Sequence, residues 1–231
     1  MTDATALSGR ILVLGASGTI GRALVPALRD GGATVRAAAR NRARLAAEAW
    51  AGVETITADA LNPRSLARAM AGMDTVFYLV HSMTAGGRFA RRDRQAAQAV
   101  AAAAAEAGVR RIVYLGGLTA ERAGSEHLKS RAETGDILRQ GSVPVTEVRA
   151  PIVIGPGSAA FEVMRDVAAH LPIFPAPTAV RNPTPPVAID DLVADLMALA
   201  QKPEAAGQIY DTAGPERLGY DRMIGEIADA L

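Results

Sequence analysis

The sequence has no cysteine, few aromatic residues and almost no net charge, and each of these features excludes a class of function. Without cysteine, the chain has no disulfide, no thiolate metal ligand and no cysteine nucleophile, and we predict no metal site. Aromatic residues make up 4% of the chain and the formal net charge is +1. A nucleic-acid-binding protein needs stacking surfaces and a positive field. We therefore expect no nucleic-acid partner.

Long hydrophobic runs are also missing. The uncharged stretches are too short to cross a membrane, and the first ten residues (MTDATALSGR) do not follow the basic-then-apolar pattern of a secretory signal. We expect a cytoplasmic protein with no membrane insertion. Its 231 residues are enough for one α/β domain with a good core and a small appendage.

Up to residue 150, short apolar runs alternate with segments of helical period. Such alternation predicts a doubly wound parallel sheet, an α/β fold of the Rossmann type, with helices on both faces. We expect residues 1–150 to form this core and residues 151–231 to complete it as a small substrate or flap region. The predicted strands are 10–14, 33–39, 53–57, 74–80, 110–115 and 144–148, and the predicted helices are 19–30, 42–50, 63–71, 88–107 and 125–140.

The pattern changes after residue 150. Six of the chain's 13 prolines lie between residues 171 and 188, which is too many for a helix or a central strand. This segment is either a flap over a substrate or a stiff crossing of the surface. The chain then predicts a helix near 190–200, a short strand at 207–211 and a final amphipathic segment at 220–231.

Three glycines follow the first predicted strand in the spacing G-x-x-G-x-x-G, at Gly15, Gly18 and Gly21. Positions without a side chain let backbone N–H groups approach a pyrophosphate, and the helix that begins there adds its positive amino end. The glycines alone are a weak signal, but a strand precedes them and a helix follows. The sequence therefore predicts a site for a nucleotide cofactor.

The residue after the second predicted strand is Arg40. NAD-specific sites usually place a carboxylate here to bind the ribose 2′-hydroxyl. A guanidinium instead suits a 2′-phosphate, because it offers a planar fork of donors and a permanent charge. NADP is therefore favoured over NAD. The arginines that follow, Arg42 and Arg44, can equally be solvated charges on the next helix.

Several motifs in the same order resemble a known family. They are GASGTIG at 15–21, the pair Asp59-Ala60, YLVHSM at 78–83, RIVYLGGL at 111–118 and RAPIVIGPGSAAFE at 149–162. Together they resemble the atypical and extended short-chain dehydrogenase/reductases, specifically the NmrA-like and YbjT-like NAD(P)H-binding proteins. The resemblance spans nearly the whole chain.

The resemblance implies a role for each matching position. The glycine turn would bind the pyrophosphate, Arg40 the 2′-phosphate and Asp59 the adenine amino group, while the later strand ends would surround the nicotinamide and its ribose. The implied cofactor-binding residues are Gly15, Ser17, Gly18, Thr19, Ile20, Gly21, Arg40, Asp59, Ala60, Val80, His81, Ser82, Gly116, Gly117, Pro151, Ile152 and Val153. These positions fall at the carboxyl ends of predicted strands, where open α/β sheets bind ligands.

The catalytic motif of these relatives is altered here. Most of them carry Tyr-x-x-x-Lys on the helix after the fifth strand, and the matching residues are His127 and Arg131. The four-residue spacing keeps both on one helix face, and an imidazole titrates near pH 6.5. His127 is therefore a candidate general acid with Arg131 as the ribose anchor, and the alternative is a polar residue at the rim of a cleft. We expect His170 at the surface.

Two further features remain open. The segment 88–94 (RFARRDR) crowds arginines at the start of a predicted helix, whose dipole favours anions there. They invite an anionic ligand, or they form a solvated cluster partly offset by Asp93. The alanine run at 101–105 permits close packing, and the resemblance implies that this helix can form a homodimer interface, although helix propensity alone explains the run.

Two functions from different classes fit these residues. The first is an NADP-dependent oxidoreductase acting on a small organic substrate, and the second is a non-catalytic NADP(H) sensor of the NmrA type. An epimerase or dehydratase is a weaker third, because those enzymes also use the tyrosine that His127 replaces. The sequence leaves the substrate open. YbjT-like relatives often have a further carboxyl-terminal segment, so we expect either that this short form is complete or that such a segment is missing.

Overall fold

The protein contains a seven-stranded parallel sheet in the order β3-β2-β1-β4-β5-β6-β9. The computed structural model describes residues 9–81, 89–118, 125–170 and 183–231. Because β1 lies between β2 and β4, the strand order reverses beside it, which is the switch point of a doubly wound fold. The strands are β1 (Arg10–Leu14), β2 (Thr34–Ala39), β3 (Glu54–Thr57), β4 (Thr75–Tyr78), β5 (Arg111–Gly117), β6 (Val145–Ala150) and β9 (Ile209–Asp211).

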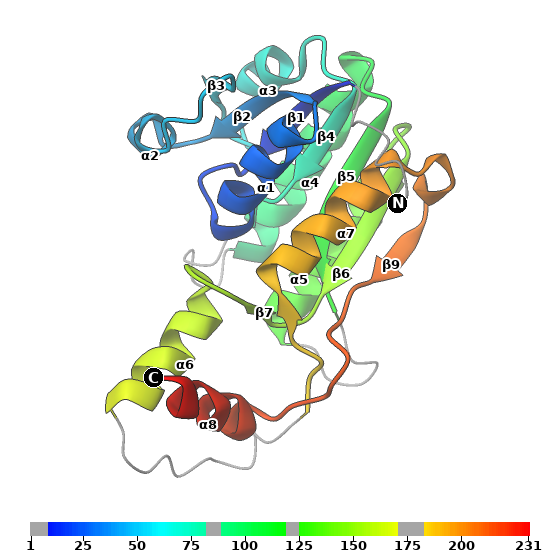
Figure 1. Cartoon of the computed structure of the whole chain (residues 1–231). Helices are drawn as coiled ribbons and strands as arrows, with labels where there is room; N and C mark the ends of the chain where they lie inside the picture. The colour runs from blue at the N-terminus through cyan, green and yellow to red at the C-terminus, as the bar shows by residue number, and fades with distance from the viewer. Residues whose placement is uncertain (1–8, 82–88, 119–124, 171–182) are drawn as a thin grey trace.

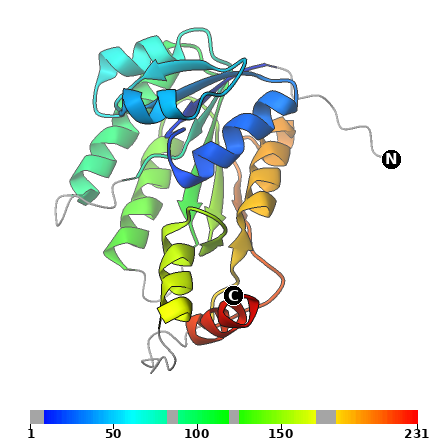
Figure 2. The ribbon, with the colours of Figure 1, turned by 60° about the vertical axis from the view of Figure 1, so that its left-hand side comes forward.

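Helices cover both faces of this sheet, as Figures 1 and 2 show. One face packs against α3 (Pro63–Met70), α4 (Phe89–Glu106) and α5 (Glu126–Arg139), and the other against α1 (Thr19–Asp30), α2 (Arg42–Ala47) and α7 (Ile189–Gln201). Leu12 and Val13 of β1 belong to the two different cores, as alternation along a strand requires. The predicted α/β fold with a doubly wound parallel sheet is confirmed.

The helix ends are set by local sequence. Asn62 accepts a hydrogen bond from the backbone N–H of Ser65 (3.2 Å) at the start of α3, and Ser125 accepts one from Leu128 (3.3 Å) at the start of α5. Both are side-chain caps that satisfy the first free N–H groups of a helix. Pro63, at the first position of α3, needs no hydrogen bond there.

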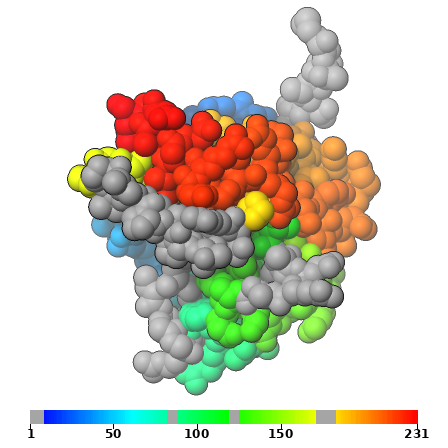
Figure 3. All heavy atoms as spheres, turned by 90° about the horizontal axis from the view of Figure 1, so that it is seen from below, coloured from blue at the N-terminus to red at the C-terminus, as the bar shows by residue number. Residues whose placement is uncertain are grey.

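A small second layer lies beyond the carboxyl ends of the strands. Helices α6 (Ala159–His170) and α8 (Tyr220–Ala230) pack together around Met164, Met223 and Ile224, apart from the sheet in Figures 1 and 2. Seen from below, the red residues of α8 lie beside the yellow residues of α6 (Figure 3). A two-stranded sheet of β7 (Val153–Ile154) and β8 (Val187–Ala188) connects this layer to β6 and α7.

Every strand and helix predicted up to residue 150 is present, with small differences at the ends. Helix α6 and strands β7 and β8 were not predicted. Of the proline-rich segment, residues 171–182 lie outside the described residues, whereas Thr184 pairs with Leu218 in an antiparallel bridge. In the part of the chain that the structure describes, no helix is both long and apolar enough to cross a bilayer.

Candidate functional site

The glycine turn between β1 and α1 depends on the absence of side chains. Gly15 has φ +101°, and its N–H donates to the carbonyl of Ala38 (2.9 Å). A Cβ on Gly21 would lie 2.6 Å from backbone atoms of Ala16 and Gly15, so only glycine fits there. Within the described chain, no side chain caps the amino end of α1 and its first turn holds no acidic residue. The positive end of α1 is therefore available to an anion.

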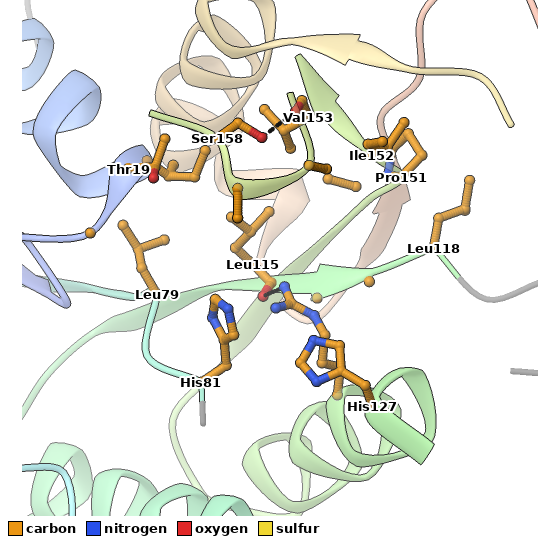
Figure 4. Close-up of a pocket in the computed structure, with 18 of the residues that line it drawn as sticks. Thr19, Leu79, His81, Leu115, Leu118, His127, Pro151, Ile152, Val153 and Ser158 are labelled. Carbon is orange, nitrogen blue, oxygen red and sulfur yellow. Dashed lines mark hydrogen bonds between the residues drawn. The ribbon is translucent and has the colours of Figure 1, made fainter. Parts of the chain in front are cut away.

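This turn forms one wall of a cavity of about 520 Å³ at the carboxyl ends of β1, β4, β5 and β6 (Figure 4). The other walls come from α5, from the segment between β6 and β7, from the start of α6, and from α8. A volume of this size is typical of sites for small organic molecules. The lining residues are Gly15, Gly18, Thr19, Ile20, Gly21, Leu79, His81, Leu115, Gly116, Gly117, Leu118, His127, Leu128, Arg131, Ala150, Pro151, Ile152, Val153, Ser158, Ala159, Ala160, Thr184 and Tyr220.

Most of the predicted site residues meet in this cavity. Five belong to the glycine turn, His81 follows β4, the pair Gly116-Gly117 ends β5, and Pro151 to Val153 follow β6. Both catalytic candidates, His127 and Arg131, also line the cavity. Residues from distant parts of the sequence are thus brought together at the edge of the sheet where a ligand is expected.

A second hollow, about 640 Å³ in volume, lies beside the turn. Its lining consists of Ser17 and the run from Arg40 to Arg44. Arg40, Arg42 and Arg44 are exposed, and none of them has an ion-pair partner within the described part of the chain. The guanidinium predicted to bind a 2′-phosphate therefore lies beside a residue of the predicted pyrophosphate turn. Arg42 and Arg44, for which a purely solvated role was the alternative, line the same hollow.

Three of the predicted residues lie outside both hollows, and a fourth is not among the described residues. Asp59, Ala60 and Val80 line neither hollow. Asp59 Oδ1 accepts a hydrogen bond from the backbone N–H of Leu61 (3.0 Å), which fixes the turn into α3. Ala60 is buried and Val80 packs against the same core. Ser82 lies outside the described residues.

His127 lies next to a second histidine, His81, in the cavity wall. The ring centroids of His81 and His127 are 5.8 Å apart, and those of Phe89 and His127 are 6.2 Å apart; Figure 4 shows both imidazoles on the same side of the cavity. Desolvation, and then the charge of Arg131, lowers the pKa of His127 below its usual value. The same two causes, in the same order, lower the pKa of His81 to about 4. Both rings are therefore mainly neutral at pH 7.

Arg131 lies against the floor of the cavity. Its Nη2 donates to the carbonyl of Leu115 (2.6 Å), and its buried Nε has no hydrogen-bond partner within the described chain. Burial lowers the pKa of this guanidinium. A Cβ on Gly117 would lie 2.8 Å from Leu128 and 3.1 Å from Arg131 Nε. The glycine at this position therefore lets α5 bring Arg131 up to the end of β5.

At the arginine-rich start of α4, two residues of the expected solvated cluster contact α5 instead. Asp93 is buried, and its Oδ2 accepts a hydrogen bond from Ser130 Oγ on α5 (3.0 Å). Arg94 pairs with Glu133 (3.0 Å), whereas Arg91 and Arg92 are exposed. Asp93 and Arg94 thus join α4 to the helix that carries His127 rather than forming an anion site. His170 is exposed, as predicted.

The lining residues that the sequence did not single out are mostly apolar. They are Leu79, Leu115, Leu118, Leu128, Ala150, Ser158, Ala159, Ala160, Thr184 and Tyr220. A signal existed for some of them, because the motif at 149–162 already included residues 158 to 160. Thr184 lies in the proline-rich segment 171–188, for which a flap over a substrate was one of two alternatives. Nothing local marked Tyr220, which packs in the cluster between α6 and α8.

Comparison with known proteins agrees with this geometry. Residues 15–152, more than half of the chain, match the NAD(P)H-binding family. A ceramide reductase from Caulobacter vibrioides is 30% identical over 87% of this chain and 63% of its own length. A (4-alkanoyl-5-oxo-2,5-dihydrofuran-3-yl)methyl phosphate reductase from Streptomyces griseus is 31% identical over 96% of this chain and 73% of its own length. The chain thus spans less than two thirds of the first relative.

Solved structures show the same fold at lower identity. An epimerase from Methanothermobacter thermautotrophicus has a TM-score of 0.83 and 18% identity, covering 98% of this chain and 78% of that one. A dTDP-glucose 4,6-dehydratase from Streptomyces venezuelae, solved with NAD, has a TM-score of 0.81 and 22% identity, covering 96% and 80%. The chain belongs to the NAD(P)H-binding family and has the Rossmann fold of the atypical short-chain dehydrogenase/reductases.

Proposed function

We propose that the protein is an NADP-dependent oxidoreductase that reduces a small organic carbonyl compound. One observation carries the proposal: the glycine turn, the end of β5 and the pair His127 and Arg131 all line one cavity. The two relatives named above are both reductases, which supports the direction. We also propose that residues 1–150 hold the dinucleotide and that residues 151–231 complete the substrate side.

The residues present fit the cofactor. Gly21 lets α1 begin close to the backbone of Gly15 and Ala16, and the amino end of α1, which no described side chain caps, can donate to a pyrophosphate. The second hollow adds three arginines beside Ser17, and a phosphate on the ribose 2′-oxygen would meet them. This arrangement supports NADP over NAD.

In this proposal His127 and Arg131 act in the reduction. A dihydronicotinamide held by the glycine turn and Arg131 would supply a hydride to the carbonyl carbon of the substrate, and the π electron pair of the C=O bond would go to the oxygen. The imidazole of His127 would hold the proton that this oxygen takes up, and a second proton from solvent would restore the imidazolium. The guanidinium of Arg131, with its Nε unpartnered in the described chain, would donate to the ribose hydroxyls. The products are the alcohol and the oxidised cofactor.

Calorimetric titration with NADPH, NADH, NADP and NAD tests the cofactor. We expect NADPH to bind roughly 10- to 100-fold more tightly than NADH, because hydrogen bonds to a charged group contribute about 1.5–3 kcal/mol. Arg40→Ala should erase most of this preference. Arg110→Ala is the matched control: Arg110 is an exposed arginine at the amino end of β5, paired with Asp74 (3.0 Å). Equal affinities for NADPH and NADH in the unmodified protein would overturn the NADP preference.

One observation favours a second function, a non-catalytic NADP(H) sensor of the NmrA type. Desolvation lowers the pKa of His127, so less imidazolium is present at pH 7 to protonate a substrate. Steady-state oxidation of NADPH against a panel of carbonyl compounds and quinones distinguishes the two functions. Tight NADPH binding without turnover of any acceptor would favour the sensor and count against the enzyme.

A further inference from the structure

The end of the cavity opposite the glycine turn is apolar. Figure 4 shows Thr19 and Leu79 at one end and Leu118, Pro151 and Ile152 at the other, with His81 and His127 on one side. Ile152 belongs to the hydrophobic cluster between α6 and α8, as does Tyr220. Ala160 lies one helical turn before Met164, which is in the same cluster. This end is therefore continuous with the core of the second layer.

Two of the hydroxyl groups that line the cavity already donate to the backbone. Ser158 Oγ donates to the carbonyl of Val153 (2.6 Å), and Thr19 Oγ1 donates to the carbonyl of Gly157 (2.6 Å). A hydroxyl that is satisfied by the backbone offers less to a ligand than a free one. A sugar or another polyol would thus gain little from these two hydroxyls.

The distribution of charged residues in the cavity also favours an uncharged ligand at the apolar end. Of the described lining residues none is acidic, and the basic ones are His81, His127 and Arg131. Arg131 lies against Leu115, on the floor rather than at the apolar end. Recognition of a diphosphate uses several charged donors, and the apolar end has none among the described residues.

We propose that the substrate carries an uncharged aliphatic chain, which lies between Leu118, Ile152, Ala160 and Tyr220 while its carbonyl group meets His127. This inference rests on the proposed function and deepens it by naming the substrate class. It distinguishes this protein from one structural neighbour named above, the dTDP-glucose 4,6-dehydratase, whose name gives a nucleotide sugar as its substrate.

The first test compares straight-chain aldehydes with NADPH. From butanal to octanal, kcat/KM should rise about fourfold for each methylene that the apolar end buries. Ala160→Phe fills this end and should lower the octanal-to-butanal ratio at least tenfold. Val163→Phe is the control on the same helix: its side chain is 63% exposed and does not line the cavity, so the ratio should stay as in the unmodified protein. If circular dichroism shows that phenylalanine at this position disturbs α6, Ala160→Leu is used as the test variant instead.

A binding measurement tests the same site without turnover. Ligand-observed NMR titration of octan-1-ol and butan-1-ol, with and without NADP, should give the longer alcohol a clearly lower dissociation constant, and Ala160→Phe should weaken octan-1-ol selectively. Equal affinity for the two alcohols, or displacement of octan-1-ol by UDP-glucose, would overturn the inference.

The two proposals fail in different ways. If NADPH does not bind in calorimetry while octan-1-ol still binds in preference to butan-1-ol, the oxidoreductase proposal fails and the apolar site stands. If NADPH binds and is oxidised with no dependence on chain length, the function stands and the inference fails.

Discussion

Beside α1 the wall of the cavity is made of backbone, whereas beside α5 and α6 it is made of side chains. On the first side, Gly15 and Gly18 donate their N–H groups to the carbonyls of Ala38 and Gly15, which fixes the turn, and the amino end of α1, which no described side chain caps, faces the cavity. On the second side, His127, Leu128 and Ala160 project from helices. A wall of backbone suits a ligand part that never changes, such as a pyrophosphate, while a wall of side chains can be altered one residue at a time.

The largest effect is expected on the side-chain wall, at His127. Replacing it with phenylalanine keeps a ring but removes the proton donor, so kcat/KM should fall about 10²- to 10⁴-fold if it acts as a general acid. NADPH affinity, measured by calorimetry, should change little. Lys129→Ala, an exposed change on the same helix, is the control. A variant that keeps full activity would remove His127 from the reaction.

The same residue predicts a pH dependence. Desolvation and Arg131 lower the pKa of His127, and nearby Asp93 partly opposes them. The protonated form is therefore scarce at pH 8 and increases as the pH falls below 6.5. Initial rates of NADPH oxidation should therefore rise as the pH falls from 8 to below 6.5. In His127→Phe the rates should not change with pH over this range. His81 titrates near pH 4, so it should not contribute above pH 5.5.

An intermediate effect is expected on the backbone wall. In Gly21→Ala the added Cβ would lie 2.6 Å from Ala16 and Gly15, so the turn must shift. We expect NADPH affinity to fall about tenfold or more and the free energy of unfolding to fall by ~1–3 kcal/mol. Gly225→Ala in α8 is the matched control, because its Cβ would meet no atom within 4 Å, and it should be neutral or stabilising. If both variants bind NADPH equally well, the two walls do not differ as described.

The smallest effect is expected where the two walls meet. Thr19 Oγ1 donates to the carbonyl of Gly157, which joins the glycine turn to the start of α6. Thr19→Val removes this hydrogen bond and should lower the free energy of unfolding by about 1 kcal/mol, or Tm by about 2–4 °C. Thr55→Val, at an exposed position of β3, is the control. Equal thermal unfolding curves for the two variants would show that this link contributes little.

The contrast between the walls also explains which parts of the site could be predicted. The strand at 10–14, the glycine turn and the helix at 19–30 follow from contiguous residues, and the structure has them as β1 and α1. The position of Arg40 beside Ser17 follows from the same logic, because β2 is the parallel neighbour of β1. The burial of Asp93 was not predicted, because the sequence analysis assigned it to a solvated arginine cluster, although it shares a helical stripe with the buried residues Ala96, Ala97 and Val100.

Other features had no local signal. Helix α6 buries one residue, Met164, and strands β7 and β8 are two residues each, so no periodicity marks them. The lowered pKa of His127 could not be predicted either, since an isolated imidazole titrates near 6.5 and only packing desolvates it.

By itself, the sequence determined the parallel sheet, the glycine turn and the basic residues at the end of β2, because each depends on interactions within one strand–helix unit. The tertiary structure decided the shape of the cavity and the proton affinity of its histidines. Those properties arise because α5, α6 and α8, which come from separate parts of the chain, pack around the strand ends and desolvate the site. No short stretch of sequence specifies how these three helices pack together.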